Sequence, residues 1–276
     1  MRFHDPELAR ERRHILDKLI ARMRSYAWTD VPCVVCGETE RLDVALEKWG
    51  ITMKRCGVCE HLFTSPRMPD HAVPELYGNF YWQQYQVAIG SPSIEERLAF
   101  DHANGDWKLR RDVLPHRSSG RMLDIGASSG GLVKQAADRG FDAAGLEPSA
   151  DICEMARRSH GVTMYCGTLA EQEFADGAFD ILTLHDVLEH MFEPVEEIRE
   201  MRRVLAPGGL LVIETPTTSS RNHTEQGVEW STISPLEHVH IFNEANAERI
   251  LVDNGFRVID LYSPNEDNWI AVGEAA

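Results

Sequence analysis

The fold is decided by residues 123–130, Leu123-Asp124-Ile125-Gly126-Ala127-Ser128-Ser129-Gly130, which predict the end of a buried strand, a glycine turn and the start of a helix. Glycine at position 126 lets the backbone approach a ligand closely, because no side chain intervenes. A helix that begins after Gly130 presents free backbone amides, which bind a carboxylate or a phosphate. The stretch therefore predicts a ligand-binding turn.

An acidic residue follows this turn at an informative distance. The next predicted strand, residues 141–148, ends at Glu147, about twenty residues beyond Gly126. A carboxylate at that place can accept hydrogen bonds from both hydroxyls of a ribose. A structural glycine turn and a surface glutamate would explain each feature separately, but their combination favours a nucleoside-containing cofactor.

Strands and helices alternate from residue 120 to the end of the chain. This pattern predicts an α/β fold, with a parallel sheet covered by helices on both faces and right-handed crossovers. We expect strands at 121–127, 141–148, 162–169, 179–185 and 210–216, helices at 133–140, 151–161, 195–209 and 243–255, and an antiparallel edge pair at 256–263 and 268–275.

Two CxxC pairs precede this region. Cys33 and Cys36 are separated by nineteen residues from Cys56 and Cys59, and the segment between alternates like short strands. A redox dithiol needs only one pair, whereas two pairs supply the four thiolates of a tetrahedral Zn²⁺ site. We therefore expect a zinc ribbon over residues 31–66, whose closed structural metal folds the module and takes no part in catalysis.

The remaining segments give a division of the chain. The pattern of residues 1–30 predicts an amphipathic helix that packs on its own domain and carries arginines on its other face. A dimer contact or an anionic partner stays open as an alternative role for the arginine face. Residues 67–118 predict a linker with a helix from about 93 to 114, in which clustered aromatic residues either pack between domains or form a lid. The core is then expected at 119–276.

Composition limits the class of protein. A chain of 276 residues with 43% hydrophobic and 26% charged residues is typical of a soluble globular protein. We expect a cytoplasmic protein without a membrane partner, because no apolar run approaches the roughly 18 residues that a span needs. Residues 141–276 hold 8 Lys and Arg against 25 Asp and Glu, a charge that disfavours nucleic acid as a partner of that half.

The motif order from residue 119 to 276 resembles that of class I S-adenosylmethionine-dependent methyltransferases. The nearest branch is the ubiquinone-methyltransferase-like group in the form with an N-terminal zinc ribbon, common among bacterial sugar and natural-product methyltransferases. This resemblance implies a Rossmann-like seven-stranded sheet and S-adenosylmethionine as cofactor. The motifs are LDIGASSGG (123–131), GLEPS (145–149), CGTL (166–169), FDILTLHDVLEHM (179–191), REMRRVLAPGGLLVIETP (199–216) and PLEHVHIF (235–242).

The same resemblance implies the cofactor-binding residues. Around the methionyl part it places Gly126, Ala127 and Gly130, with Asp124 supporting the loop and Ser128 in place of the common second glycine. It places Glu147 on the ribose, Thr168 and Leu169 beside the adenine, His185 between the methionyl and acceptor sides, and Tyr81 and Tyr85 in a lid over the cofactor.

Methyl transfer to a hydroxyl or an ammonium also needs a base, and histidine suits this role near neutral pH. The stretch from 215 to 242 is long and polar for a simple connection, so we expect it to cap the substrate. The candidate bases are His238 first, then His240 and His185, with Asp186 as an alternative proton acceptor. His190 is expected to be structural.

These features predict a methyltransferase acting on a small-molecule hydroxyl of a sugar, sugar nucleotide or secondary metabolite. Two other readings stay open. In the first the ribbon recognises RNA for methylation, although its acidic residues outnumber its basic ones. In the second the chain is a scaffold that binds S-adenosylmethionine without catalysis. A homodimer is a further open alternative.

Overall fold

The computed structural model describes residues 6–77 and 94–276, and its centre is a seven-stranded sheet. The strand order is β10-β11-β8-β7-β4-β5-β6, in which β4 to β8 run parallel and β11 is antiparallel to both neighbours. The predicted α/β fold and the predicted antiparallel pair at the edge are confirmed. The strands are β4 (Arg121–Ile125), β5 (Asp142–Glu147), β6 (Thr163–Cys166), β7 (Phe179–His185), β8 (Leu205–Pro216), β10 (Phe256–Tyr262) and β11 (Asn268–Ala275).

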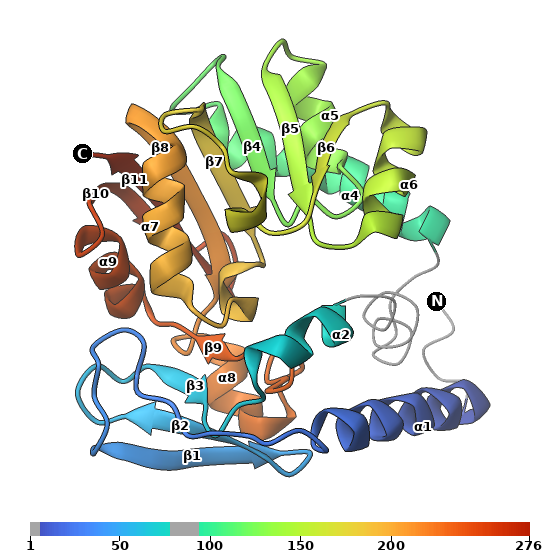
Figure 1. The fold of residues 1–276 in the computed structure, drawn as a ribbon, viewed down its shortest axis with the longest axis vertical. Coiled ribbons are helices and arrows are strands. Elements are labelled where there is room, and N and C mark those ends of the chain that lie inside the picture. Colours follow the sequence, from blue (N-terminus) through green and yellow to red (C-terminus); the bar gives the residue numbers. More distant parts are fainter. Residues whose placement is uncertain (1–5, 78–93) are drawn as a thin grey trace.

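Helices cover both faces of this sheet (Figure 1). Leu123 and Ile125 of β4 face α7 (Pro194–Val204) and α9 (Glu244–Val252), whereas Met122, which precedes them, packs on the opposite face with α5 (Gly131–Ala137). Strands that are buried on both faces read as nearly continuous apolar runs, which is the pattern of residues 121–125 and 210–213. The remaining helices of the core are α4 (Ile94–Lys108), its continuation Leu109–Val113, and α6 (Ala150–His160).

One predicted boundary is wrong. We expected a helix over residues 195–209, but α7 ends at Val204 and β8 begins at Leu205. Pro207 cannot continue a helix, and Gly208 adopts a positive φ of 71°. The segment therefore extends the strand toward its N-terminus.

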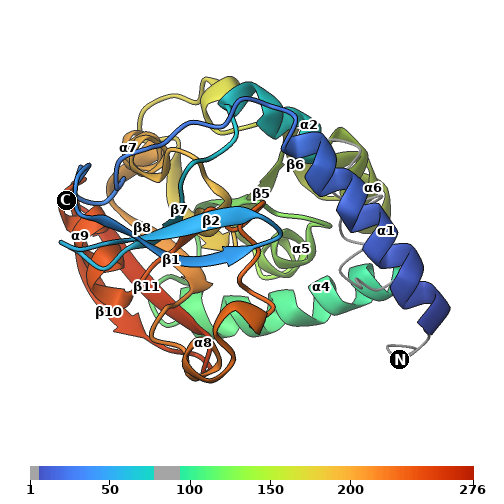
Figure 2. The same ribbon diagram turned by 90° about the horizontal axis from the view of Figure 1, so that it is seen from below.

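A second sheet of four strands lies below the first in Figure 1 and in front of it in Figure 2. It consists of β1 (Leu42–Lys48), β2 (Ile51–Cys56), β3 (Leu62–Thr64) and β9 (His240–Ile241), each antiparallel to the next. The first three strands come from the predicted ribbon segment, but β9 comes from the long loop after β8. Two segments far apart in the sequence thus share this sheet.

The N-terminal helix α1 (Pro6–Met23) packs on the same part of the molecule. Its apolar residues Leu19 and Met23 are fully buried and belong to a cluster with Leu76 and Phe192. This packing matches the predicted amphipathic helix. Shorter helices are Asp70–Ala72, α2 (Val73–Tyr77), Ala170–Gln172, Leu188–His190, α8 (Arg221–Gln226) and Gly227–Glu229. Within the described ranges, no helix has the length and apolarity to cross a bilayer.

Candidate active site

A pocket of about 810 Å³ opens where the parallel strands β4, β5 and β7 end. In open α/β sheets this edge is where ligands bind, because the loops after the strands leave a crevice there. The pocket is large enough for a nucleotide-sized ligand and a small second molecule. Of the predicted site residues it is lined by Asp124, Gly126, Ala127, Ser128, Glu147, Thr168, Leu169, His185, Asp186 and His238.

The glycine turn after β4 forms one wall. Gly126 has a φ of 70°, and a Cβ added there would lie 2.4 Å from Cγ2 of Val187. Any other residue would therefore be strained and would push on the opposite wall. The backbone amides of Gly126 and Ala127 both donate to the carbonyl of Leu146 on β5, at 2.8 and 3.0 Å. These bonds fix the turn against the neighbouring strand.

Ser128, in the position where a glycine was the expected residue, has partners of its own. Its φ is 49°, its amide donates to Glu147 Oε2 at 3.2 Å, and its hydroxyl donates to Asp101 Oδ2 at 3.1 Å. Asp101 lies on α4 and also accepts from Ser129 at 2.8 Å. Helix α4 can come this close because Gly131 has no side chain. A Cβ at Gly131 would lie 2.3 Å from the Asp101 carbonyl oxygen. Sequence reasoning missed Asp101.

Glu147 ends β5 and presents its carboxylate to the pocket. Its side chain accepts from the amides of Ser128 and Ser149, both at 3.2 Å, and only 8% of the residue is exposed. These two backbone donors hold the carboxylate in place. The carboxylate is thus positioned beside the glycine turn, as the sequence predicted.

The turn after β6 contributes differently. Thr168 and Leu169 line the pocket, and the Thr168 amide donates to Glu171 Oε2 at 2.7 Å. Gly130 does not line it: this residue caps α5 with a φ of 78°, and a Cβ there would meet Val162 at 3.0 Å. Gly130 therefore allows close packing on the side away from the pocket.

Asp124 and His185 form the floor between β4 and β7. Asp124 accepts from Thr183 Oγ1 at 2.7 Å, and burial raises its pKa. His185 Nε2 lies 2.9 Å from Asp112 Oδ2, and Asp112 is fully buried. Both Asp112 and Glu214 also accept from Arg111. Asp112, His185 and Glu214 lie close enough to hold a metal, but the Arg111 guanidinium already supplies their cation.

His238 lies at the other end of the pocket with a defined tautomer. Its Nδ1 is 2.7 Å from the carbonyl oxygen of Thr232, so this nitrogen donates and Nε2 carries the lone pair. The ring packs edge-on against His190, with 4.6 Å between centroids. His190 Nδ1 lies 3.0 Å from the hydroxyl of Tyr77, and burial lowers the pKa of His190 well below its ordinary value.

A buried carboxylate stands behind these two histidines. Glu189 is fully buried, its Oε2 accepts from Thr215 at 2.7 Å, and Oε1 has no hydrogen-bond partner among the described residues. Burial raises the pKa of Glu189 to about 7. One carboxylate oxygen and one ring nitrogen of each histidine lie within 4.8 Å of one another. Sequence reasoning missed Glu189 as a functional candidate, although the Glu-His pair at 189–190 was visible.

The structure does not bring His240 into the pocket. His240 lies on β9, 1% exposed, with Nδ1 3.0 Å from His61 Nε2, and burial lowers its pKa to about 3. Asp186 does line the pocket, with its carboxylate 3.7 Å from Lys108 Nζ. The two lid candidates Tyr81 and Tyr85 lie outside the described residues.

A family model described as a methyltransferase domain matches residues 99–261, more than half of the chain. The chain belongs to this methyltransferase domain family. The α/β core, its ligand edge and the pocket described above all lie within or beside the matched residues, and the family uses S-adenosylmethionine.

Curated relatives of this methyltransferase domain share its sequence at a moderate level. A Mycolicibacterium smegmatis protein named as a probable S-adenosylmethionine-dependent methyltransferase is 29% identical over 160 residues, 56% of this chain and 60% of that protein. A ubiquinone biosynthesis O-methyltransferase from Caulobacter is 35% identical over 101 residues, 34% of this chain and 40% of that enzyme. The chain thus spans less than two thirds of the length of the curated relatives it matches.

Solved structures agree on the fold. A SAM-dependent methyltransferase from Archaeoglobus fulgidus superposes with a TM-score of 0.54 at 14% identity, covering 70% of this chain and 99% of that one. At this identity the likeness establishes the shared architecture of the methyltransferase domain.

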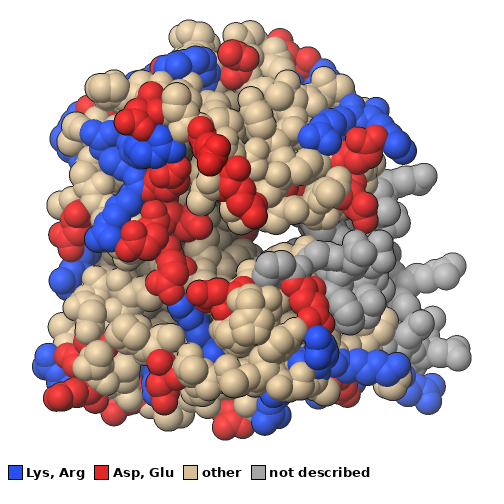
Figure 3. Space-filling model, viewed as in Figure 1, with Lys and Arg blue, Asp and Glu red and all other residues tan. Residues whose placement is uncertain are grey.

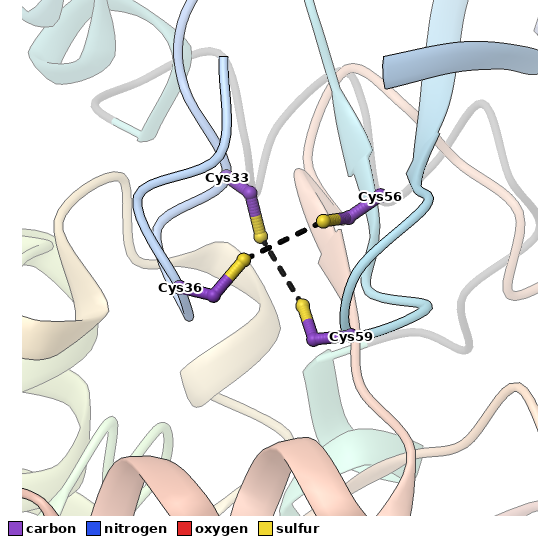
Figure 4. A group of neighbouring side chains, drawn as sticks. All are labelled: Cys33, Cys36, Cys56 and Cys59. Carbon is purple, nitrogen blue, oxygen red and sulfur yellow. Dashed lines mark hydrogen bonds between the residues drawn. The ribbon is translucent and has the colours of Figure 1, made fainter. Parts of the chain in front are cut away.

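Four cysteines converge beside this domain (Figure 4). Cys33 Sγ lies 3.5 Å from Cys59 Sγ, Cys36 Sγ lies 3.5 Å from Cys56 Sγ, and all four sulfurs lie within 4.8 Å of one another. Four sulfurs bound tetrahedrally at about 2.3 Å from Zn²⁺ would lie roughly 3.8 Å apart. The cluster is therefore compatible with the predicted zinc site.

The cysteine-bearing module contacts the loop that carries His238. The Thr64 amide donates to the Val239 carbonyl at 2.8 Å, and the Thr64 hydroxyl donates to the Pro235 carbonyl at 3.0 Å. On the other side of the cysteines, Asn246 Nδ2 donates to the Cys59 carbonyl at 2.6 Å. Residues 235–239 are thus held against the small sheet on one side and line the pocket on the other.

Proposed function

We propose that the protein transfers a methyl group from S-adenosylmethionine to a hydroxyl of a small-molecule acceptor, a sugar or secondary metabolite, with His238 as the base. The observation that carries the proposal is His238, oriented by its Nδ1 bond to the Thr232 carbonyl, at the end of a pocket whose other end has the features of a cofactor site. S-adenosylmethionine supplies a methyl group on a sulfonium sulfur, and its transfer to a hydroxyl replaces a carbon–sulfur bond by a carbon–oxygen bond and releases a proton.

The cofactor end of the pocket fits that molecule. Gly126 leaves a cradle that a single Cβ would fill, and Glu147 offers a fixed carboxylate for the ribose hydroxyls. Three carboxylates line this end, those of Asp101, Asp124 and Glu147, and S-adenosylmethionine carries a net positive charge. Thr168 and Leu169 would border the adenine, and His185 the methionyl part. These assignments are the ones that the family resemblance implies, and the lining of the pocket by each residue supports them.

The acceptor end supplies the proton acceptor. Thr232 holds the Nδ1 proton of His238, so Nε2 is ready to accept the proton that leaves the acceptor hydroxyl. The nearby carboxylates of Glu189 and Glu237 stabilise the imidazolium that forms. Because a sulfonium methyl is already activated, the other task of the protein is to align the acceptor and exclude water.

The alternative acceptors are less well supported. Ubiquinone and demethylmenaquinone methyltransferases among the relatives act, by their names, on small molecules. An RNA backbone would meet the acidic half of the chain and a pocket that carboxylates line. A scaffold without catalysis would not need a histidine at the acceptor end whose tautomer is fixed by a hydrogen bond.

For the cysteine cluster we propose structural Zn²⁺, held by Cys33, Cys36, Cys56 and Cys59. Four thiolate ligands fill a tetrahedral site and leave no position for a substrate. The metal would hold together a module of short strands, which in turn holds the loop of His238. This role is one of positioning.

Radiolabelled S-adenosylmethionine tests the proposed activity. The protein should transfer label to at least one member of a broad panel of hydroxylated metabolites, and calorimetry should show binding of S-adenosylhomocysteine. Transfer to structured RNA with none to any small molecule would contradict the proposal, and so would binding of S-adenosylhomocysteine without transfer to either class.

A further inference from the structure

The acceptor end of the pocket carries an excess of carboxylates. We define the acceptor end as the lining residues within 70–77, 186–197 and 231–238. Its acidic members are Asp70, Asp186, Glu193, Glu197 and Glu237. Among the described lining residues of the whole pocket, Lys108 is the only lysine or arginine. In Figure 3, acidic side chains gather beside the hollow at the centre of the view.

Two of these carboxylates have cationic partners within the protein. Lys108 Nζ lies 3.7 Å from Asp186, and Arg67 pairs with Glu193. Neither cation is therefore available to bind an anionic acceptor. Among the described lysines and arginines, a negative group in the pocket would gain a cationic partner only if one of these pairs were broken.

Glu197 is an acidic residue of the acceptor end for which no cationic partner is found. It lies one turn into α7, partly buried, and none of the side chains that the structure describes forms an ion pair with it. Burial raises its pKa, and the neighbouring Glu200 raises it further. A partly buried carboxylate beside a like charge gains from a cation in contact with it. Asp70, across the acceptor end, is exposed and adds negative potential.

We propose that the methyl acceptor is a hydroxylated small molecule bearing a protonated amine, such as an amino alcohol or an amino sugar, and that Glu197 binds its ammonium group. Phosphate- and carboxylate-bearing acceptors, nucleotide-linked sugars included, would be repelled. The inference rests on the proposed function and narrows its substrate class.

The charge also selects the atom that is methylated. An ammonium nitrogen has no lone pair, so the amine paired with Glu197 cannot attack a methyl group. The hydroxyl attacks instead: its oxygen forms the new bond to the methyl carbon, its proton passes to His238 Nε2, and the carbon–sulfur bond breaks. His238 and Glu197 therefore have separate roles, one at the reacting oxygen and one at the ammonium.

Matched probes test the substrate class without knowledge of the natural acceptor. Saturation-transfer NMR on the protein with bound S-adenosylhomocysteine would compare two series, each with an ammonium member, a neutral member and a member that bears an anionic group. The first series is glucosamine, N-acetylglucosamine and glucosamine 6-phosphate. The second is 2-aminocyclohexanol, cyclohexane-1,2-diol and 2-hydroxycyclohexanecarboxylate. The ammonium member should bind best in both series. Equal or tighter binding of the phosphate or carboxylate member would overturn the inference, as would binding of none of the six.

Two neighbouring glutamates provide the variants. Glu197→Gln should weaken binding of the ammonium probes about 5- to 10-fold and leave the neutral probes unchanged, because one charge-assisted contact is lost. Glu196→Gln, an exposed neighbour that does not line the pocket, should change neither. Equal effects of both variants would overturn the role of Glu197. Failure of the wild-type protein to bind S-adenosylhomocysteine would instead refute the proposed function.

Discussion

Single buried groups beside this pocket carry measurable free energies. Glu189 is the clearest example, because its carboxylate is fully buried with one oxygen bonded only to Thr215 Oγ1 and the other without a partner among the described residues. Burial raises its pKa to about 7, from an ordinary value of 4.5. The folded state therefore holds a proton that the unfolded state releases between these two pH values.

Replacing this carboxyl should stabilise the protein in a pH-dependent way. Below about pH 4.5 both states are protonated and Glu189→Gln should have little effect, whereas above pH 7 the wild type bears the cost of a buried charge, up to roughly 3 kcal/mol. Thermal unfolding at pH 5 and pH 8 would measure the difference. Glu248→Gln, at an exposed position on α9, serves as control. A shift of equal size at both pH values would contradict the burial argument.

Glu147 should matter for the cofactor. Glu147→Ala removes the carboxylate proposed to bind the ribose and should weaken binding of S-adenosylhomocysteine about 10- to 100-fold, the worth of charged hydrogen bonds. Calorimetry measures this directly. Asp142→Ala, at the opposite, exposed end of β5, should leave the affinity within about two-fold. An unchanged affinity in Glu147→Ala would remove Glu147 from the cofactor site.

His238 should affect turnover and not cofactor binding. In His238→Asn the amide can still donate to Thr232, but it cannot accept a proton, so turnover should fall about 10²- to 10⁴-fold. S-adenosylhomocysteine affinity should stay within about two-fold. His116→Asn, which does not line the pocket, is the matched control. Full turnover in His238→Asn would show that another group takes the proton.

At the scale of elements, the loop that carries His238 depends on the small sheet. Residues 235–242 are bonded to β3 through Thr64 and continue into β9, which pairs with β3. His61, two residues beyond Cys59, stacks on Phe63 and His240 and packs at a tilt against Phe242. The order of the cysteine module therefore determines the position of the acceptor-end loop.

Loss of the proposed metal should reduce stability and methyl transfer but not cofactor binding. Cys36→Ser should lower the bound zinc, measured by mass spectrometry, lower the melting temperature and reduce methyl transfer. Binding of S-adenosylhomocysteine should persist, because the glycine turn and Glu147 belong to the other sheet. Cys166→Ser, an exposed cysteine outside the cluster, is the control. A zinc-free protein with wild-type stability would contradict the structural role of the metal.

Local signals account for what the sequence predicted at this scale. The glycine turn, Glu147 and the two CxxC pairs are each encoded within a few residues, and the alternation of strands and helices gave the sheet. The pairing of β3 with β9 and the contact of Asp101 with Ser128 join distant segments, and no local pattern reports such contacts. His240 illustrates the limit: it lies two residues after His238, but it belongs to β9 and its ring is buried against His61, whereas His238 precedes the strand and bonds to the Thr232 carbonyl beside the pocket.

At the scale of the whole molecule, the negative charge favours a small-molecule acceptor over RNA. The acidic excess of residues 141–276 was visible in the sequence, and the structure places part of it on the wall of the pocket. Fluorescence anisotropy with a structured RNA should therefore show no saturable binding at 50 to 150 mM salt, an ionic strength at which phosphate contacts still contribute. Binding that weakens steeply with salt would contradict the small-molecule assignment.

The pairing of β3 with β9 also sets an order of events during synthesis. The edge of β3 is made early, but its partner at His240 and Ile241 is translated roughly 10 to 35 s later at ordinary ribosome speeds. Until then the edge of β3 keeps its backbone groups unpaired, and a chain in this state is open to pairing with other strands. The nascent protein is thus most prone to aggregation after β3 is synthesised and before β9, in the last sixth of the chain, is available to pair with it.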